Sequence, residues 1–84
     1  MNNEKQKKEV LVKFGKHLAE VRKSKKLSFR KLSALCDVDY SDIKKYEKGE
    51  KDLRLLTIID LAIGLDINPK ELLNFDFEFL KKYK

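Results

Sequence analysis

Cysteine, histidine, proline and glycine are rare in this chain of 84 residues, and tryptophan is absent. The single cysteine, Cys36, leaves no intramolecular disulfide, and no cluster of Cys and His residues is available to hold zinc. We therefore expect a reducing compartment and no metal or other cofactor. One proline and three glycines are too few for the turns of a β-sandwich, so the composition predicts an all-α fold.

Long apolar runs are also missing from the chain. Residues 2–5 are polar or charged, and no stretch after them has the length of a signal-peptide core or a membrane span. We therefore expect an unexported protein of the cytoplasm. The hydrophobic content of 42% is nevertheless too high for a disordered chain, and 84 residues suffice for one domain with a single core.

The positive charge is concentrated near the N-terminus. Residues 1–27 carry nine Lys and Arg against three Asp and Glu, whereas residues 28–84 carry eleven of each, for a net charge of +6. This balance favours a polyanionic partner such as nucleic acid. We expect residues 1–8 to form a basic arm or helix extension. The basic N-terminal segment with Lys5, Lys7, Lys8, Lys13 and Lys16 could be a solubilising face, an arm touching DNA phosphates or a membrane-surface helix. We favour the first, because the apolar residues that follow are needed inside the domain.

Apolar spacing predicts five helical segments. The first covers residues 9–25 and the second, capped by Ser28, covers residues 28–36. The third covers residues 40–48, and the fourth, from Leu55 to Leu65, is apolar around so much of its surface that we expect it to be largely buried. The fifth is short and begins at Pro69 after an Asn68 cap.

Turn residues between these segments predict how the helices begin and end. Asp39 and Asp42 resemble a capping box at the start of the third helix, and Gly49 is placed to end it in a left-handed conformation. Asp52 is a candidate cap for the fourth helix.

The C-terminal segment, residues 75–84, alternates Phe75, Phe77 and Phe79 with acidic residues. This period of two suits a strand with one apolar face. The aromatic residues could cover the core, or pair with the same segment of a second subunit as a strand or a short helix, so the segment is a candidate dimer contact.

The second and third helices are joined by a three-residue turn, which is the arrangement of a helix-turn-helix unit whose second helix can enter a DNA major groove. The outer face of the third helix carries lysines, a hydroxyl and a phenol, which can donate hydrogen bonds to phosphates and guanine acceptors. Donors at the start of the second helix, together with its positive dipole end, suit phosphates. The residues assigned to phosphates are Ser28, Arg30, Lys31 and Lys48.

The run from Phe14 to Leu73 resembles the phage-repressor, or Xre-like, helix-turn-helix family. The matching residues are Phe14, Gly15, Leu18, Arg22, Leu27, Ser28, Leu32, Val38, Ile43, Glu47, Lys48, Gly49, Leu61, Ala62, Leu72 and Leu73. The resemblance implies a compact, lambda-repressor-like bundle of five helices over residues 9–74, with the third as the recognition helix. It also implies a structural ion pair between Arg22 and Glu47, and core positions for Ile43 and Tyr46. The residues it assigns to base reading are Tyr40, Ser41, Lys44 and Lys45.

The chain departs from the family pattern at several positions. Phe29 takes the place of a Gln that reaches a phosphate, so that hydrogen bond cannot be made here. Asp37 replaces the usual turn Gly, although Asp tolerates a left-handed conformation better than most residues. Leu53 and Arg54 stand where a Pro and a capping Ser are frequent.

These observations predict a sequence-specific, DNA-binding transcriptional regulator on the nucleoid, with the third helix in the major groove of double-stranded DNA. It would act as a homodimer on a pseudo-palindromic site, without a small-molecule ligand. The alternative is a protein-interaction or antitoxin-like module that kept the fold. We expect no enzyme, because the chain has no nucleophile beside a base, no phosphate loop and no metal cluster. His17 and Cys36 are interpreted as packing residues.

Overall fold

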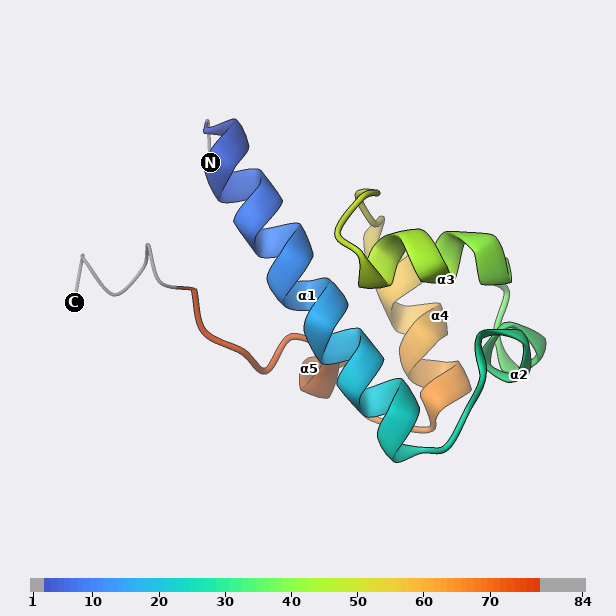
Figure 1. Cartoon of the computed structure of the whole chain (residues 1–84). Coiled ribbons are helices and arrows are strands. Elements are labelled where there is room, and N and C mark those ends of the chain that lie inside the picture. The colour runs from blue at the N-terminus through green and yellow to red at the C-terminus, as the bar shows by residue number, and fades with distance from the viewer. Residues whose placement is uncertain (1–2, 78–84) are drawn as a thin grey trace.

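The computed structural model describes residues 3–77, which form a bundle of helices without any strand in that range (Figure 1). The helices are α1 (Glu4–Ser24), α2 (Phe29–Leu35), α3 (Tyr40–Glu47), α4 (Leu55–Leu65) and α5 (Pro69–Leu72). The all-α prediction and the order of five helices are confirmed. No helix in the described range is long and apolar enough to cross a membrane.

Local capping explains where three of the helices start. The Asn3 side chain accepts a hydrogen bond of 2.7 Å from the Lys5 backbone N–H, so α1 begins at Glu4, ahead of the predicted start. Ser28 caps α2 by accepting from Lys31, and Asn68 caps α5 by accepting from Lys70, each at 3.1 Å. The predicted caps Ser28 and Asn68 are therefore confirmed.

Two predicted carboxylate caps are wrong. The Asp39 side chain makes no capping hydrogen bond to α3, and its Oδ2 accepts from the Ser41 hydroxyl at 3.2 Å. Asp42 does not complete a capping box, because it pairs with Lys51 at 2.9 Å. Asp52 accepts from the adjacent Leu53 N–H, outside α4, which begins without a side-chain cap.

Left-handed residues occur at three described positions, Lys26, Gly49 and Asp66. Gly49, with φ 71°, follows α3 as predicted, and Asp66, with φ 57°, follows α4. Asp37, which stands at the usual turn Gly of the family, is not left-handed. The chain leaves α2 through an extended Cys36, with φ −146° and ψ 174°, so no left-handed residue is needed there.

Buried residues from all five helices and from the α2–α3 turn form one core. It consists of Phe14, Leu18, Leu32, Val38, Ile43, Tyr46, Leu61, Ala62, Leu65 and Leu72. α3 packs on α1 and α2, and α4 packs on α2 and α5. The prediction that α4 is largely buried holds for one face only, because Leu55, Leu56 and Ile63 on the other face are 66 to 73% exposed.

The described part of the aromatic segment packs onto its own chain. The ring of Phe75 lies 6.4 Å from that of Phe14 and 5.8 Å from that of His17, and Phe77 contacts Phe75 at 5.1 Å. Residues 74–77 have no regular secondary structure, so the predicted strand is wrong for this part. Phe79 and the rest of the segment lie outside the described residues.

The single histidine and cysteine both have packing roles. A ring nitrogen of His17 hydrogen-bonds the Glu71 carbonyl, which joins α1 to α5. The Cys36 thiol donates to the Leu32 carbonyl at 3.2 Å and packs against the core, and its burial raises its pKa. Among residues 3–77, no group of three or more His, Cys, Asp or Glu side chains could hold a metal ion.

Candidate nucleic-acid interface

The α2–α3 unit is held as one rigid piece. Val38, in the connection between the two helices, is 7% exposed, and its carbonyl accepts a hydrogen bond of 2.7 Å from the Ser33 hydroxyl of α2. Leu32 of α2 and Ile43 of α3 are both fully buried in the same core. The orientation of α3 relative to α2 is therefore set by packing on both sides of the turn.

α3 has a buried face and a basic outer face. Ile43 and Tyr46 enter the core, as the family resemblance implies. Ser41, Lys44, Lys45 and Lys48 are exposed and Tyr40 is half-buried. The acidic residues of α3 are occupied by partners elsewhere, because Asp42 binds Lys51 and Glu47 binds Arg22. The positive charge of the outer face is therefore not cancelled, although residues 39–51 carry equal numbers of acids and lysines.

Cations and aromatic rings connect the two helices at this surface. The Arg30 guanidinium lies 4.4 Å from the centre of the Tyr40 ring. The Lys44 ammonium lies 5.4 Å from the Tyr40 ring and 5.5 Å from the Phe29 ring. These distances are those of cation–π contacts, so Tyr40 and Phe29 hold the two cations at defined places.

The structure thus brings together residues that the sequence assigned to different roles. Arg30, predicted for phosphates, adjoins Tyr40 and Lys44, predicted for bases, whereas Lys48 lies at the opposite end of α3. Ser28 uses its hydroxyl to cap α2. From the sequence alone, Phe29 is notable only because it replaces a Gln that would donate a hydrogen bond to a phosphate. Its role as a platform depends on residues from separate helices, which show no linear pattern.

The predicted ion pair between Arg22 and Glu47 is confirmed. Arg22 Nε donates to Glu47 Oε2 at 2.6 Å and a second guanidinium nitrogen donates to Oε1 at 3.1 Å, while the third reaches the Leu27 carbonyl at 2.7 Å. The guanidinium also stacks 4.1 Å from the centre of the Phe29 ring. The two charged side chains are 9% and 8% exposed, so this pair fastens α1 to the end of α3 inside the protein.

A second link between α1 and α3 is a direct backbone contact at Gly15. A Cβ atom at this position would lie 2.5 Å from the Glu47 carbonyl oxygen and closer still to that of Tyr46. Any larger residue would therefore push the two helices apart. Gly15 and Arg22 together hold α3 at one angle against α1.

Comparison with known proteins places this geometry in a family. The family described as helix-turn-helix matches residues 18–72. This chain belongs to that helix-turn-helix family. Control protein C.BamHI of Bacillus amyloliquefaciens is 33% identical over 63 residues, which are 74% of this chain and 78% of that protein.

A solved structure supports the same assignment. The restriction-modification controller protein C.AhdI from Aeromonas hydrophila has a similar crystal structure, with a TM-score of 0.72 and 44% sequence identity. The match covers 74% of this chain and 94% of that protein. The chain is therefore a sequence-specific, DNA-binding transcriptional regulator of the phage-repressor type.

Proposed function

We propose that this helix-turn-helix protein controls transcription of the genes of a restriction-modification system. The observation that carries the proposal is the basic outer face of α3, which lies beside the hydrogen-bond donors at the start of α2. The chain that carries this surface is 44% identical to a restriction-modification controller protein. Both relatives are named as control proteins and neither as an enzyme. Such a regulator acts on the nucleoid, in the cytoplasm.

α3 enters the major groove in this proposal. Lysine side chains donate well to the O6 and N7 acceptors of guanine, and hydroxyl groups bond several base edges. The residues that read bases are Tyr40, Ser41, Lys44 and Lys45, and those that contact phosphates are Ser28, Arg30, Lys31 and Lys48. Lys44 is held between Tyr40 and Phe29, which reduces the side-chain freedom that it loses on binding.

The protein binds DNA as a homodimer on a pseudo-palindromic site, with half-sites roughly 34 Å apart. The exposed apolar face of α4, formed by Leu55, Leu56 and Ile63, supports such a dimer, because apolar side chains grouped on one face favour a protein contact. Phe75 already packs on its own chain, so we place the dimer contact on α4.

Sedimentation of two variants tests the dimer. Leu56→Lys together with Ile63→Lys should yield monomers, because each places a charge in the α4 contact. Deletion of residues 78–84 should leave the dimer intact. Monomers from the deletion, with dimers from the lysine variant, would assign the contact to the C-terminal segment instead.

Selection from a randomised duplex library tests DNA reading directly. The unaltered protein should enrich a palindromic motif, and Lys44→Ala with Lys45→Ala should lose it. Lys31→Ala is the matched control, because removal of a phosphate contact should weaken binding uniformly and keep the motif. If the unaltered protein enriches nothing even at low salt, the protein is an interaction module and the proposal fails.

A further inference from the structure

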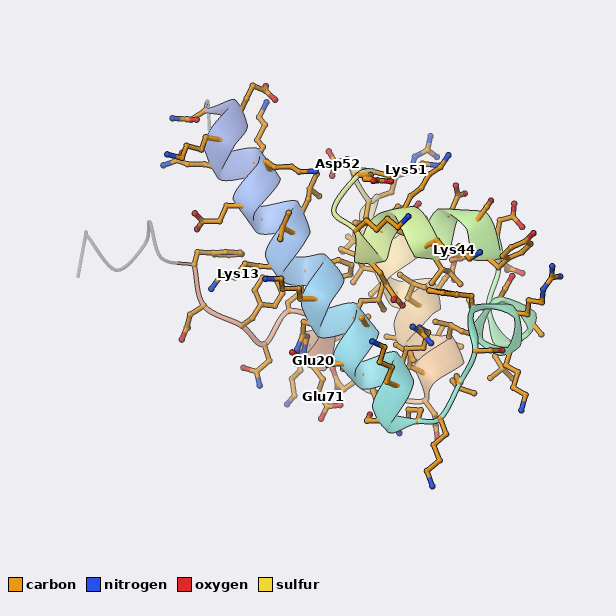
Figure 2. The ribbon with its side chains drawn as sticks, in the orientation of Figure 1. Lys13, Glu20, Lys44, Lys51, Asp52 and Glu71 are labelled. Atoms are coloured by element: carbon orange, nitrogen blue, oxygen red, sulfur yellow. The ribbon has the colours of Figure 1, made fainter. Side chains whose placement is uncertain are left out.

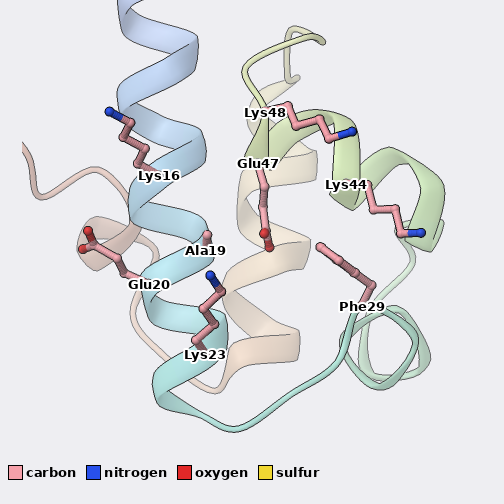
Figure 3. A pocket seen from close by; sticks show the side chains of 8 residues that line it. All are labelled: Lys16, Ala19, Glu20, Lys23, Phe29, Lys44, Glu47 and Lys48. Carbon is pink, nitrogen blue, oxygen red and sulfur yellow. The ribbon is translucent and has the colours of Figure 1, made fainter.

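A groove of about 570 Å³ lies between α1 and α3, beside the outer face of α3 (Figure 3). Lysines from both helices line it, with Lys16 and Lys23 on α1 and Lys44 and Lys48 on α3. All four side chains belong to exposed residues. Only the two lysines of α3 belong to the surface proposed above, so the two of α1 require an explanation of their own.

The groove is basic once the ion pairs are considered. Its two acidic residues are Glu20 and Glu47. Glu47 is neutralised by its buried pair with Arg22, whereas the Glu20 side chain is 79% exposed and lies 4.0 Å from the His17 ring. Four lysines and one solvated carboxylate therefore line the groove, so its net charge favours an anionic ligand.

The two walls of the groove are held in a fixed relation. Lys16 directly follows Gly15, where α1 touches the α3 backbone, and Lys23 directly follows Arg22, which is bonded to Glu47. Each lysine of α1 is thus anchored next to a link between the helices. The backbone positions of both lysines are therefore fixed before any ligand binds.

The spacing of the lysines points to an extended ligand. Lys16 and Lys23 lie seven residues apart on α1, which is about 10 Å along the helix axis. This separation corresponds to about three consecutive phosphates of one DNA strand. A DNA strand carries a phosphate for roughly every 3.4 Å of helix axis, so its backbone can contact both. Phe29 and Ala19, which also line the groove, have no side-chain donors, so phosphates must bind to the lysines.

We infer that this groove holds the sugar-phosphate backbone of one DNA strand, with Lys16 and Lys23 each contacting a phosphate. The inference rests on the proposed function and adds α1 to its DNA interface. Because phosphate contacts carry no sequence information, these two lysines supply affinity and leave the base preference unchanged.

Salt dependence of DNA binding tests the inference. Binding of the full chain to a random-sequence duplex is measured by fluorescence anisotropy at several salt concentrations. Lys16→Ala with Lys23→Ala should reduce the slope of log affinity against log salt by about 1.8, which is about 0.9 for each lost contact. The control, Lys5→Ala with Lys70→Ala, removes the same charge away from the groove, since Lys5 lies in the first turn of α1 and Lys70 on α5. Lys13 (Figure 2) is kept in both variants, because it lines a separate hollow together with Lys16 and Glu20. The slope of the control should stay unchanged.

A variant that removes a negative charge from the groove gives a second test. Glu20→Gln removes the one solvated carboxylate of the groove and should tighten binding at low salt. Equal slopes for the two double variants, or no loss in Lys16→Ala with Lys23→Ala, would overturn the inference while the protein still binds DNA. If the unaltered protein shows no salt-dependent binding at all, the proposed function itself fails. Circular dichroism of each variant confirms that it is folded.

Discussion

Removal of Arg22 should destabilise the domain severely, because it leaves the Glu47 carboxylate buried without its partner. Glu47 is 8% exposed and receives two hydrogen bonds from Arg22, at 2.6 and 3.1 Å. Breaking a buried pair on one side costs about 3 to 5 kcal/mol. Domains of this size are stable by about 5 to 15 kcal/mol, so Arg22→Ala should consume much of the free energy of unfolding.

Urea denaturation followed by circular dichroism measures this loss. With an m-value near 1.5 kcal/mol/M, the midpoint should fall by about 2 to 3 M. Lys23→Ala, an exposed charge on the same helix, is the matched control and should change stability by less than about 0.5 kcal/mol.

A double variant separates the lost charge partner from lost packing. Arg22→Met with Glu47→Leu removes both charges and should recover most of the stability, because apolar residues can replace a buried pair at little cost. A loss below about 1 kcal/mol in Arg22→Ala would refute the reasoning, since it would mean that Glu47 is well solvated without Arg22. A double variant as unstable as the single one would show that packing rather than charge dominates.

Three further changes test other parts of the structure. Gly15→Ala should lower the free energy of unfolding by about 1 to 3 kcal/mol, because its Cβ would collide with the α3 backbone. An unchanged midpoint in thermal or urea unfolding would refute the close contact between α1 and α3 at Gly15. Cys36 should react more slowly with iodoacetamide near pH 8 in the native state than in urea, since burial raises the thiol pKa and lowers the thiolate fraction. Lys44→Ala should relax base preference in library selection more than Lys31→Ala, and equal effects would argue against base reading by Lys44.

Features that depend on neighbours in the sequence were predicted well. The Ser28 and Asn68 caps bond backbone N–H groups two or three residues away, and Gly49 meets a local demand for a left-handed residue. The type and order of the helices follow in the same way, because an apolar stripe at helical spacing is a property of one segment.

Predictions failed where a side chain had a competing partner. Asp42 was expected to cap α3, yet it pairs with Lys51, which lies beyond the end of that helix. Asp39 accepts from Ser41 instead of a backbone N–H. The alternation at Phe75 suits a strand, but its ring packs on Phe14 of α1, which agrees with the alternative that the aromatic residues cover the core. A local sequence pattern cannot show which partner a side chain will contact, because that depends on which groups the fold brings within reach.

By itself, the sequence determined the helical bundle, the basic outer face of α3 and the pairing of Arg22 with Glu47, the last through its family resemblance. The helical spacing of apolar residues and the alignment with the residues of the Xre-like family carry that information. The tertiary structure alone decided that Lys16 and Lys23 line the same groove as α3. That placement depends on two helices crossing at Gly15 at one angle, which is set by close packing of segments distant in the chain.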